Sequence, residues 1–204
     1  ASDVYKRQPK LWSAETPNLY DLKLTALDAK GQVAESTDTR IGFRTVEIAK
    51  GNVLVNGKPV LFKGVDRHEL SPYGGYNVTR DEMINDIREM KRLNVNAVRT
   101  SHYPNDPQWY ELCDLYGIYV IDEANVEGHG MGYGDRAVAK DPQFNKAIKE
   151  RARRMVERDR NHPSIIMWSL GNESGMGQNF LDSYAMVKEM DTTRPCLLYT
   201  SDAA

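Results

Sequence analysis

The sequence lacks a long apolar run, an excess of one charge and a set of cysteines. No apolar run approaches the ~18 residues that a membrane span needs, and the mean hydropathy is −0.61, so we expect no membrane partner. The 204 residues carry 27 basic and 29 acidic side chains, a net charge of −2. This balance predicts no general attraction to nucleic acid. Two cysteines, Cys113 and Cys196, are too few for a disulfide framework.

The two ends of the sequence also lack expected features. The first residues contain no apolar segment of a signal peptide, and the first methionine is Met83. We therefore expect no leader in this stretch; the compartment stays open, with the cytoplasm favoured. Residues 1–8 and 197–204 read like a translated sequencing adapter. We interpret both ends as non-native and assign them no function.

Residues 9–50 have the pattern of β structure. Apolar and polar side chains alternate from Tyr20 to Ala26, which is the period of a strand with one buried face. A turn at Asp28–Gly31 leads into a second, more polar run, and Gly42–Ile48 supplies a third. Three strands in about forty residues are typical of a small β-sandwich. We therefore expect the C-terminal part of an immunoglobulin-like β-sandwich domain.

Strand and helix patterns alternate from Gly51 onward. Asn56-Gly57 predicts a tight hairpin, and four apolar runs then each precede a helical pattern. The runs lie at residues 61–65, 96–100, 118–122 and 164–170, and the helices begin near Thr79, Asp106, Asp141 and Gln178. Short buried strands that alternate with helices predict an α/β fold with a parallel sheet.

Two α/β architectures share this local pattern, a doubly wound sheet and a (β/α)8 TIM barrel. Gly64–Gly75, after the first strand, contains no glycine-rich phosphate loop, which a nucleotide-binding doubly wound sheet should have. Polar residues instead follow the carboxyl ends of successive strands, where barrel active sites form: His68, His102, Glu127, His129, Asn172 and Glu173. A barrel takes roughly 250 residues, more than remain after Gly51. We therefore expect an incomplete TIM barrel over residues 51–196.

The sharpest motif is Asn172-Glu173, which follows the apolar run at 164–170. A carboxyl group at the rim of an apolar wall is suited to general acid catalysis, because burial favours the protonated form. A lone Glu after a strand is more often a simple helix cap. The adjacent Asn172 and the other polar strand ends favour the catalytic interpretation.

The loop Asp122–Gly130 places three carboxylates and one histidine after a strand. Glu127 and His129 are two residues apart, so in an extended chain they point the same way, like two ligands of one ion. Carboxylates favour a hard cation such as Mg²⁺, although a histidine ligand is unusual for it. The alternative is a solvated acidic loop.

Three further side chains at strand ends suit sugar binding. His68 and His102 each follow a strand, and we interpret them as hydrogen-bond donors to a polyhydroxylated substrate. A lone histidine is more often structural, but two at equivalent positions favour binding. Arg99 could anchor a carboxylate across the mouth, and a structural ion pair explains it equally well.

Four ordered motifs together resemble the β-galactosidase branch of glycoside hydrolase family 2: GVDRHE, AVRTSHYP, DEANVEGHG and RDRNHPSIIMWSLGNES. The resemblance covers about Pro9 to Pro195. It implies a β-sandwich followed by a (β/α)8 barrel, in a homo-oligomeric enzyme that hydrolyses terminal β-D-galactosides with retention. The resemblance also implies that the second catalytic carboxylate, the nucleophile, follows the seventh barrel strand and so lies outside this chain.

The resemblance assigns roles to the residues already singled out. It implies that Glu173 is the general acid/base and that Asn172 contacts the sugar 2-hydroxyl. Glu127, His129 and Glu173 correspond to Mg²⁺ ligands, and a monovalent Na⁺ or K⁺ fits the complete enzyme as well. His68 and His102 correspond to galactose-binding histidines, and Arg99 to an arginine that supports the nucleophile.

Two other functions stay open at this point. One is a different glycosidase of the same family, a β-glucuronidase or a β-mannosidase. The other is a sugar-binding remnant without catalysis. The paired histidines His68 and His102 and the acidic loop favour the galactoside, and an intact acid/base motif would be unnecessary in a binding module.

Overall fold

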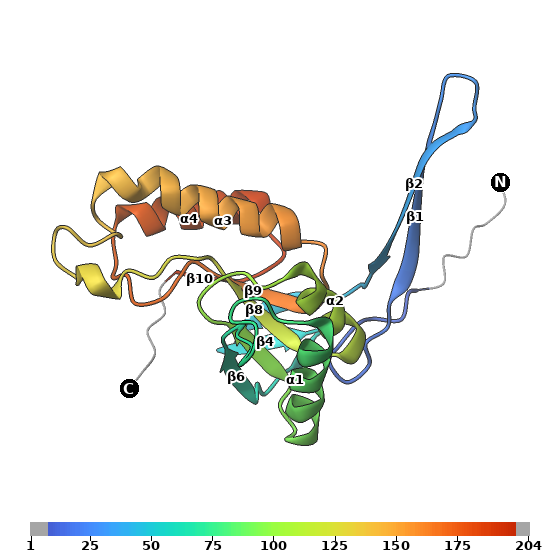
Figure 1. Cartoon of the computed structure of the whole chain (residues 1–204), viewed down its shortest axis with the longest axis horizontal. Coiled ribbons are helices and arrows are strands. Elements are labelled where there is room, and N and C mark those ends of the chain that lie inside the picture. The colour runs from blue at the N-terminus through green and yellow to red at the C-terminus, as the bar shows by residue number, and fades with distance from the viewer. Residues whose placement is uncertain (1–7, 199–204) are drawn as a thin grey trace.

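Five parallel strands form the central sheet of the chain (Figure 1). The computed structural model describes residues 8–198. The strands lie in the order β10-β9-β8-β7-β6, and all four neighbouring pairs are parallel. Their bounds are β6 Gly64–Arg67, β7 Ala97–Thr100, β8 Tyr119–Glu123, β9 Ile165–Ser169 and β10 Cys196–Leu197.

A helix connects each strand of this sheet to the next. The helices are α1 Arg80–Arg92, α2 Pro107–Tyr116, α3 Asn145–Asp159 and α4 Gln178–Met190, with short 3-10 turns η1 His129–Met131 and η2 Pro142–Phe144 before α3. Within residues 8–198, strands that are consecutive in the chain are neighbours, so the order never reverses as it does in a doubly wound sheet. This is the succession of β/α units that builds a barrel, and the predicted parallel α/β fold is confirmed.

Local sequence signals explain where the helices begin. Thr79 and Glu82 form a capping box where the helix α1 is predicted to begin, and the Asp106 carboxylate accepts from the Gln108 N–H at the start of α2. The prediction for the third helix was wrong in its start. Asp141 caps only η2, and α3 begins at Asn145.

The first strand of the sheet also begins later than the apolar run at 61–65 predicts. The Asn96 side chain accepts from the Lys63 N–H at 2.8 Å and donates to the Leu61 carbonyl at 3.0 Å. These side-chain bonds take the place of ladder bonds, so pairing between β6 and β7 starts at Gly64. The strand then continues to Arg67, which brings the following His68 to the sheet's carboxyl edge.

Both faces of the middle strands of the sheet, β7, β8 and β9, are buried. Val98 and Val120 belong to the core between the sheet and the helices, whereas their neighbours Ala97 and Tyr119 belong to a second core on the opposite face. The alternation follows from the two-residue period of a strand. Trp12, which is fully buried, fills part of the second core with its ring 5.7 Å from that of Tyr119.

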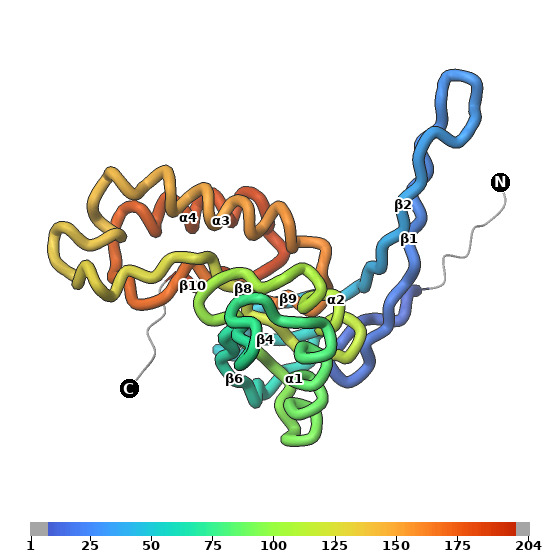
Figure 2. Tube along the Cα trace, in the orientation of Figure 1, coloured from blue at the N-terminus to red at the C-terminus, as the bar shows by residue number. Residues whose placement is uncertain are grey.

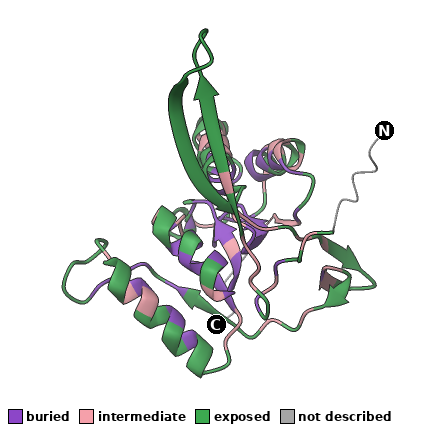
Figure 3. Cartoon of the chain, turned by 90° about the vertical axis from the view of Figure 1, so that its right-hand side faces the viewer, coloured by how far each residue is buried: buried purple, intermediate pink, exposed green. Residues whose placement is uncertain are grey.

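The N-terminal β structure divides into two sheets. β1 Tyr20–Leu27 and β2 Val33–Ile41 form an antiparallel hairpin that stands away from the rest of the chain (Figures 1 and 3). The predicted third strand is not part of this hairpin. β3 Val46–Ala49 pairs instead with β4 Asn52–Val55, which pairs with β5 Lys58–Pro59. Asn56 and Gly57 both have positive φ (53° and 73°), as the predicted tight turn requires.

Gly117 ends α2 and offers a test of this packing. Its φ is +75°, and an added Cβ would lie 2.2 Å from the Ala14 carbonyl oxygen, whereas Gly31 has φ +76° with nothing within 4 Å. Both Gly→Ala changes incur the left-handed backbone cost of about 1–2 kcal/mol, but only Gly117→Ala adds a backbone clash. We expect Gly117→Ala to lower the free energy of unfolding by about 3 kcal/mol or more, and Gly31→Ala to cost clearly less. Equal losses in urea unfolding would contradict this.

Two predictions concern the ends and the membrane. Residues 1–7 and 199–204, most of the two stretches interpreted as non-native, lie outside the described residues, while Leu197 pairs with Ser169 in the sheet. Among residues 8–198, no helix combines the length and the apolar character required to cross a membrane.

Candidate active site

The candidate site lies where the loops after β8 and β9 run side by side (Figure 2). Glu127 and Asn172 form an isolated parallel bridge between these loops, and the Asn172 N–H donates to the Val126 carbonyl at 2.8 Å. The Asn172 amide also donates to the Glu127 carboxylate at 2.9 Å. The two motifs that the sequence singled out are thus joined directly, through backbone and side chain.

The backbone at Glu173 is left-handed, with φ +41°. Such a conformation is uncommon for a residue with a side chain and is held only by its surroundings. Gly171 permits the close approach of the loops, because a Cβ there would lie 2.5 Å from the Val126 carbonyl oxygen. The Glu173 carboxylate, about a quarter exposed (24%), contacts Nδ1 of His129, which is itself exposed. Glu173 is therefore fixed in place at the surface of the site.

Arg99 connects two carboxylates, Glu123 on β8 and Asp66 on β6, with the amide of Asn172 after β9. Its guanidinium donates to Asn172 Oδ1 at 2.7 Å and binds both oxygens of Glu123, at 2.8 and 3.1 Å. It also lies 3.6 Å from Asp66 at the end of β6. These contacts are those of an internal ion pair that also binds the Asn172 amide, and the role of Arg99 toward a nucleophile stays a prediction.

The two predicted sugar-binding histidines meet at the same edge of the sheet. The rings of His68 and His102 pack edge to face, 5.5 Å apart, and Tyr103 lies beyond His68 at 6.3 Å. His102 Nδ1 is 2.7 Å from the Glu123 carboxylate and 3.3 Å from Arg99. A single chain of contacts therefore links all seven predicted site residues: His68, His102, Arg99, Asn172, Glu127, His129 and Glu173.

Sequence reasoning assigned no role to Glu123, which contacts two members of this chain, His102 and Arg99. A usable signal was present in the alternation of β8. Glu123 lies on the same side of the strand as Tyr119, which belongs to the second core. A carboxylate on such a buried face requires a charged partner. That partner is Arg99, which lies opposite Ile121, two residues before Glu123 on the same side of β8.

The three predicted metal ligands are neighbours, but they are arranged for hydrogen bonding. Their donor chemistry, two carboxylates and an imidazole, is only partly that of a magnesium site. His129 Nδ1 contacts the Glu173 carboxylate itself, and Glu127 accepts from Asn172 and from the His129 N–H. Within the described part of the chain, no group of three or more His, Cys, Asp or Glu side chains is placed to hold a metal ion.

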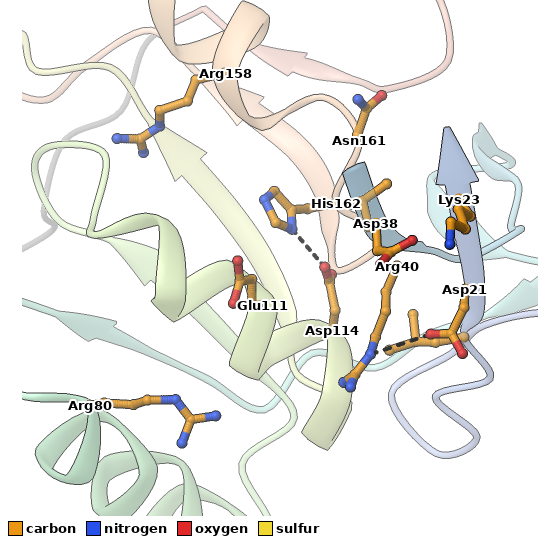
Figure 4. Close-up of a pocket in the computed structure, with 12 residues that line it drawn as sticks. Asp21, Lys23, Asp38, Arg40, Arg80, Glu111, Asp114, Arg158, Asn161 and His162 are labelled. Carbon is orange, nitrogen blue, oxygen red and sulfur yellow. Dashed lines mark hydrogen bonds and ion pairs between the residues drawn. The ribbon is translucent and has the colours of Figure 1, made fainter. Parts of the chain in front are cut away.

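A cavity of about 890 Å³ lies elsewhere, between the β1–β2 hairpin and α2 (Figure 4). His162 and Asp114, paired at 2.6 Å, line it together with the Arg40–Asp21 ion pair. His162 precedes β9 and Asp114 precedes β8, so this cavity opens at the amino ends of the strands. It is therefore separate from the candidate site at their carboxyl ends.

The fold and the site together define a β/α-barrel protein whose polar side chains gather at the strands' carboxyl ends. Two family models match the chain, "Glycosyl hydrolases family 2" over residues 2–44 and "Glycosyl hydrolases family 2, TIM barrel domain" over residues 46–204. The chain belongs to glycosyl hydrolase family 2.

Several curated relatives of this chain are β-galactosidases. A β-galactosidase of Vibrio vulnificus (strain YJ016) is 54% identical over 192 residues, which are 94% of this chain and 18% of that protein. A β-galactosidase of Lactococcus lactis subsp. lactis (strain IL1403) is 54% identical over 92% of this chain and 19% of its own length. The chain thus spans about a fifth of these curated relatives.

Solved structures with the same fold carry other names. A β-glucuronidase from Ruminococcus gnavus in complex with D-glucuronic acid superposes with a TM-score of 0.81 and 31% identity, over 92% of this chain and 32% of that one. A β-galacturonidase from Eisenbergiella tayi bound to galacturonate gives a TM-score of 0.81 and 29% identity, over 94% and 34%. At these identities the superposition supports the family fold rather than one substrate.

Proposed function

We propose that this chain is part of a retaining β-galactosidase that hydrolyses terminal non-reducing β-D-galactosides, lactose among them. The Asn172-Glu173 pair carries the proposal: it stands at a strand's carboxyl end, with Asn172 bound by Arg99 and Glu127 and Glu173 facing His129. The identity of 54% to β-galactosidases over nearly the whole chain favours the galactoside.

The geometry suggests how these residues share the reaction. Retaining glycosidases place two carboxyl groups about 5–5.5 Å apart, one as nucleophile and the other as proton shuttle. Glu173 would give its proton to the leaving-group oxygen and later take a proton from the incoming water. Asn172, fixed at both ends of its amide, would bind a sugar hydroxyl next to the reacting carbon. The nucleophile would come from the remainder of the enzyme.

A β-glucuronidase is the second candidate, because the superposed structures include a protein named so and a β-galacturonidase. A uronic acid substrate carries a carboxylate that needs a cation, and in the described residues Arg99 is already engaged by Glu123 and Asn172. Activity of the complete enzyme on nitrophenyl galactoside, glucuronide and mannoside tests the proposal. A preference for either of the latter two would refute it, and no turnover of any would favour a binding module.

We also propose that Mg²⁺ binds beside Glu127, His129 and Glu173 in the complete enzyme, with a monovalent Na⁺ or K⁺ elsewhere in the site. The proposal is supported by the adjacency of the three side chains; binding requires that His129 turn away from Glu173. Glu127→Gln in the complete enzyme should weaken the apparent affinity for activating Mg²⁺ at least about tenfold. Titration of chelated enzyme with Mg²⁺ measures this. An unchanged titration would contradict the site, and Glu111→Gln, on α2, is the control.

Three further features complete the proposal for the whole enzyme. The β1–β2 hairpin would be the C-terminal part of an immunoglobulin-like β-sandwich, whose other strands would cover its exposed apolar side chains Leu24, Leu27 and Val33. The enzyme would be a homo-oligomer located in the cytoplasm. Apart from its galactoside substrate, neither nucleic acid nor a membrane is an expected partner.

A further inference from the structure

Glu123 has the most enclosed carboxylate of the site. It is the last residue of β8, and its side chain is 0% exposed. Its oxygens accept from Arg99 Nε at 2.8 Å, Arg99 Nη2 at 3.1 Å and Ser169 Oγ at 2.5 Å. These charge-assisted bonds, two from Arg99 and one from Ser169, hold the carboxylate rigidly and use both of its oxygens as acceptors.

The fourth contact of Glu123 assigns the proton of His102. The distance from His102 Nδ1 to Glu123 Oε1 is 2.7 Å. An ionised carboxylate can only accept, so Nδ1 must carry the hydrogen. Arg99 Nη2, 3.3 Å from the same nitrogen, is then a second donor that shares the Oε1 acceptor and does not donate to the ring.

This assignment changes the chemistry that His102 can offer to a sugar. When Nδ1 of a neutral imidazole carries the hydrogen, Nε2 is an acceptor. The sequence predicted a hydrogen-bond donor at this position. The tautomer that Glu123 selects would instead accept from a sugar hydroxyl.

We infer that Glu123 is a positioning residue that sets the tautomer of His102 and the orientation of Arg99, and thereby the hydroxyl pattern that the site accepts. Glu123 itself is buried and touches no substrate in this scheme. It acts through His102 on a sugar hydroxyl and through Arg99 on the amide of Asn172, whose Oδ1 lies 2.7 Å from Nη2. This inference rests on the proposed function, because it requires a hydroxylated substrate at this edge of the sheet.

A double-mutant cycle in the complete enzyme tests the inference. The variants are Glu123→Gln, His102→Ala and both together, with kcat and KM measured on nitrophenyl galactoside and on its monodeoxy analogues per titrated active site. We expect Glu123→Gln to lower kcat/KM about 100-fold. The kcat/KM of the double variant should be no more than about threefold below that of the less active single variant, because one residue acts through the other. For the wild type, the analogue that lacks the hydroxyl bound by His102 should have a lower kcat/KM than the parent galactoside. Both single variants should lose this difference, and for the same analogue.

Two comparisons separate positioning from a general structural effect. Ser169→Ala keeps the carboxylate but removes its 2.5 Å bond, and it should lower kcat/KM about threefold to tenfold with the same deoxy signature. Asp122→Asn is the matched control. Asp122 is equally buried on the same strand, but its carboxyl oxygen accepts from the Tyr110 and Thr100 hydroxyls. It should keep the native kinetics and the native deoxy pattern.

The outcomes distinguish the inference from the function beneath it. A wild-type enzyme that prefers the glucuronide would refute the proposed function, and the cycle would then be measured on that glycoside. With an active wild type, multiplicative losses of Glu123→Gln and His102→Ala would overturn the inference. So would a Ser169→Ala variant whose loss is equal on all the deoxy analogues. If Glu123→Gln does not fold, the Ser169→Ala and His102→Ala cycle gives the same decision.

Discussion

Glu173→Gln in the complete enzyme should lower the hydrolysis of lactose far more than the first step with activated aryl galactosides. An alkoxide leaving group needs a proton from the general acid, whereas a nitrophenolate hardly does, and general acid catalysis contributes about 10²–10⁴-fold. The second step should also slow, because in the proposed mechanism the same residue is the base that deprotonates water. Pre-steady-state kinetics should therefore show a burst of nitrophenol followed by slow turnover.

Azide makes this prediction specific to a proton shuttle. Azide is a nucleophile that needs no base, so it should restore turnover of the aryl galactoside by Glu173→Gln and yield a β-galactosyl azide. Glu189→Gln, in the last turn of α4, is a control for loss of a carboxylate elsewhere. Absence of rescue in a folded variant, or an α-configured product, would remove Glu173 from the acid/base role.

Arg99→Ala should be among the most damaging single changes to the fold as well as to the site. It leaves the fully buried Glu123 carboxylate without its guanidinium partner, and breaking a buried ion pair costs about 3–5 kcal/mol. Arg99→Lys should restore only part of this, because one ammonium cannot reach Glu123, Asn172 and Asp66 together. Both variants should lose most of their galactosidase activity, since the Asn172 amide is no longer oriented.

Denaturant unfolding of the complete enzyme measures this loss. The double change Arg99→Ala with Glu123→Gln removes the unpaired charge and should be more stable than Arg99→Ala alone. Arg153→Ala on α3 removes an arginine whose pairs with Glu150 and Glu157 are exposed, and it should change stability little. A double variant as unstable as, or less stable than, Arg99→Ala would show that buried charge is not the cause.

The fold was largely predictable because its signals are local. The capping box of α1 and the Asp106–Pro107 start of α2 each depend on neighbours in sequence, and α4 begins at Gln178 as predicted. The errors arose where distant groups compete for the backbone. Asn96 delays β6 from a position more than thirty residues away, and no pattern around Leu61 reveals it.

The site shows the same division. Strand ends located His68, His102, Asn172 and the acidic loop, because parallel strands bring their carboxyl ends to one edge. The partner of Arg99 could not be predicted, because it depends on which residue of β8 lies beside Arg99, and the register between β7 and β8 sets this. For the same reason, sequence reasoning counted Glu123 as one acidic residue among three in its loop and assigned it no role.

Trp12 gives the boundary between the two family regions a different meaning. The match to the TIM barrel family begins at residue 46. The Trp12 indole nevertheless packs in the second core of the sheet and donates to the Asp114 carbonyl at 2.9 Å. A protein trimmed to begin at residue 46 would retain the whole matched region and lose the side chain that packs against Tyr119. For protein engineering, the unit that folds therefore starts before Trp12, and grafting or exchange of the barrel should carry this segment with it.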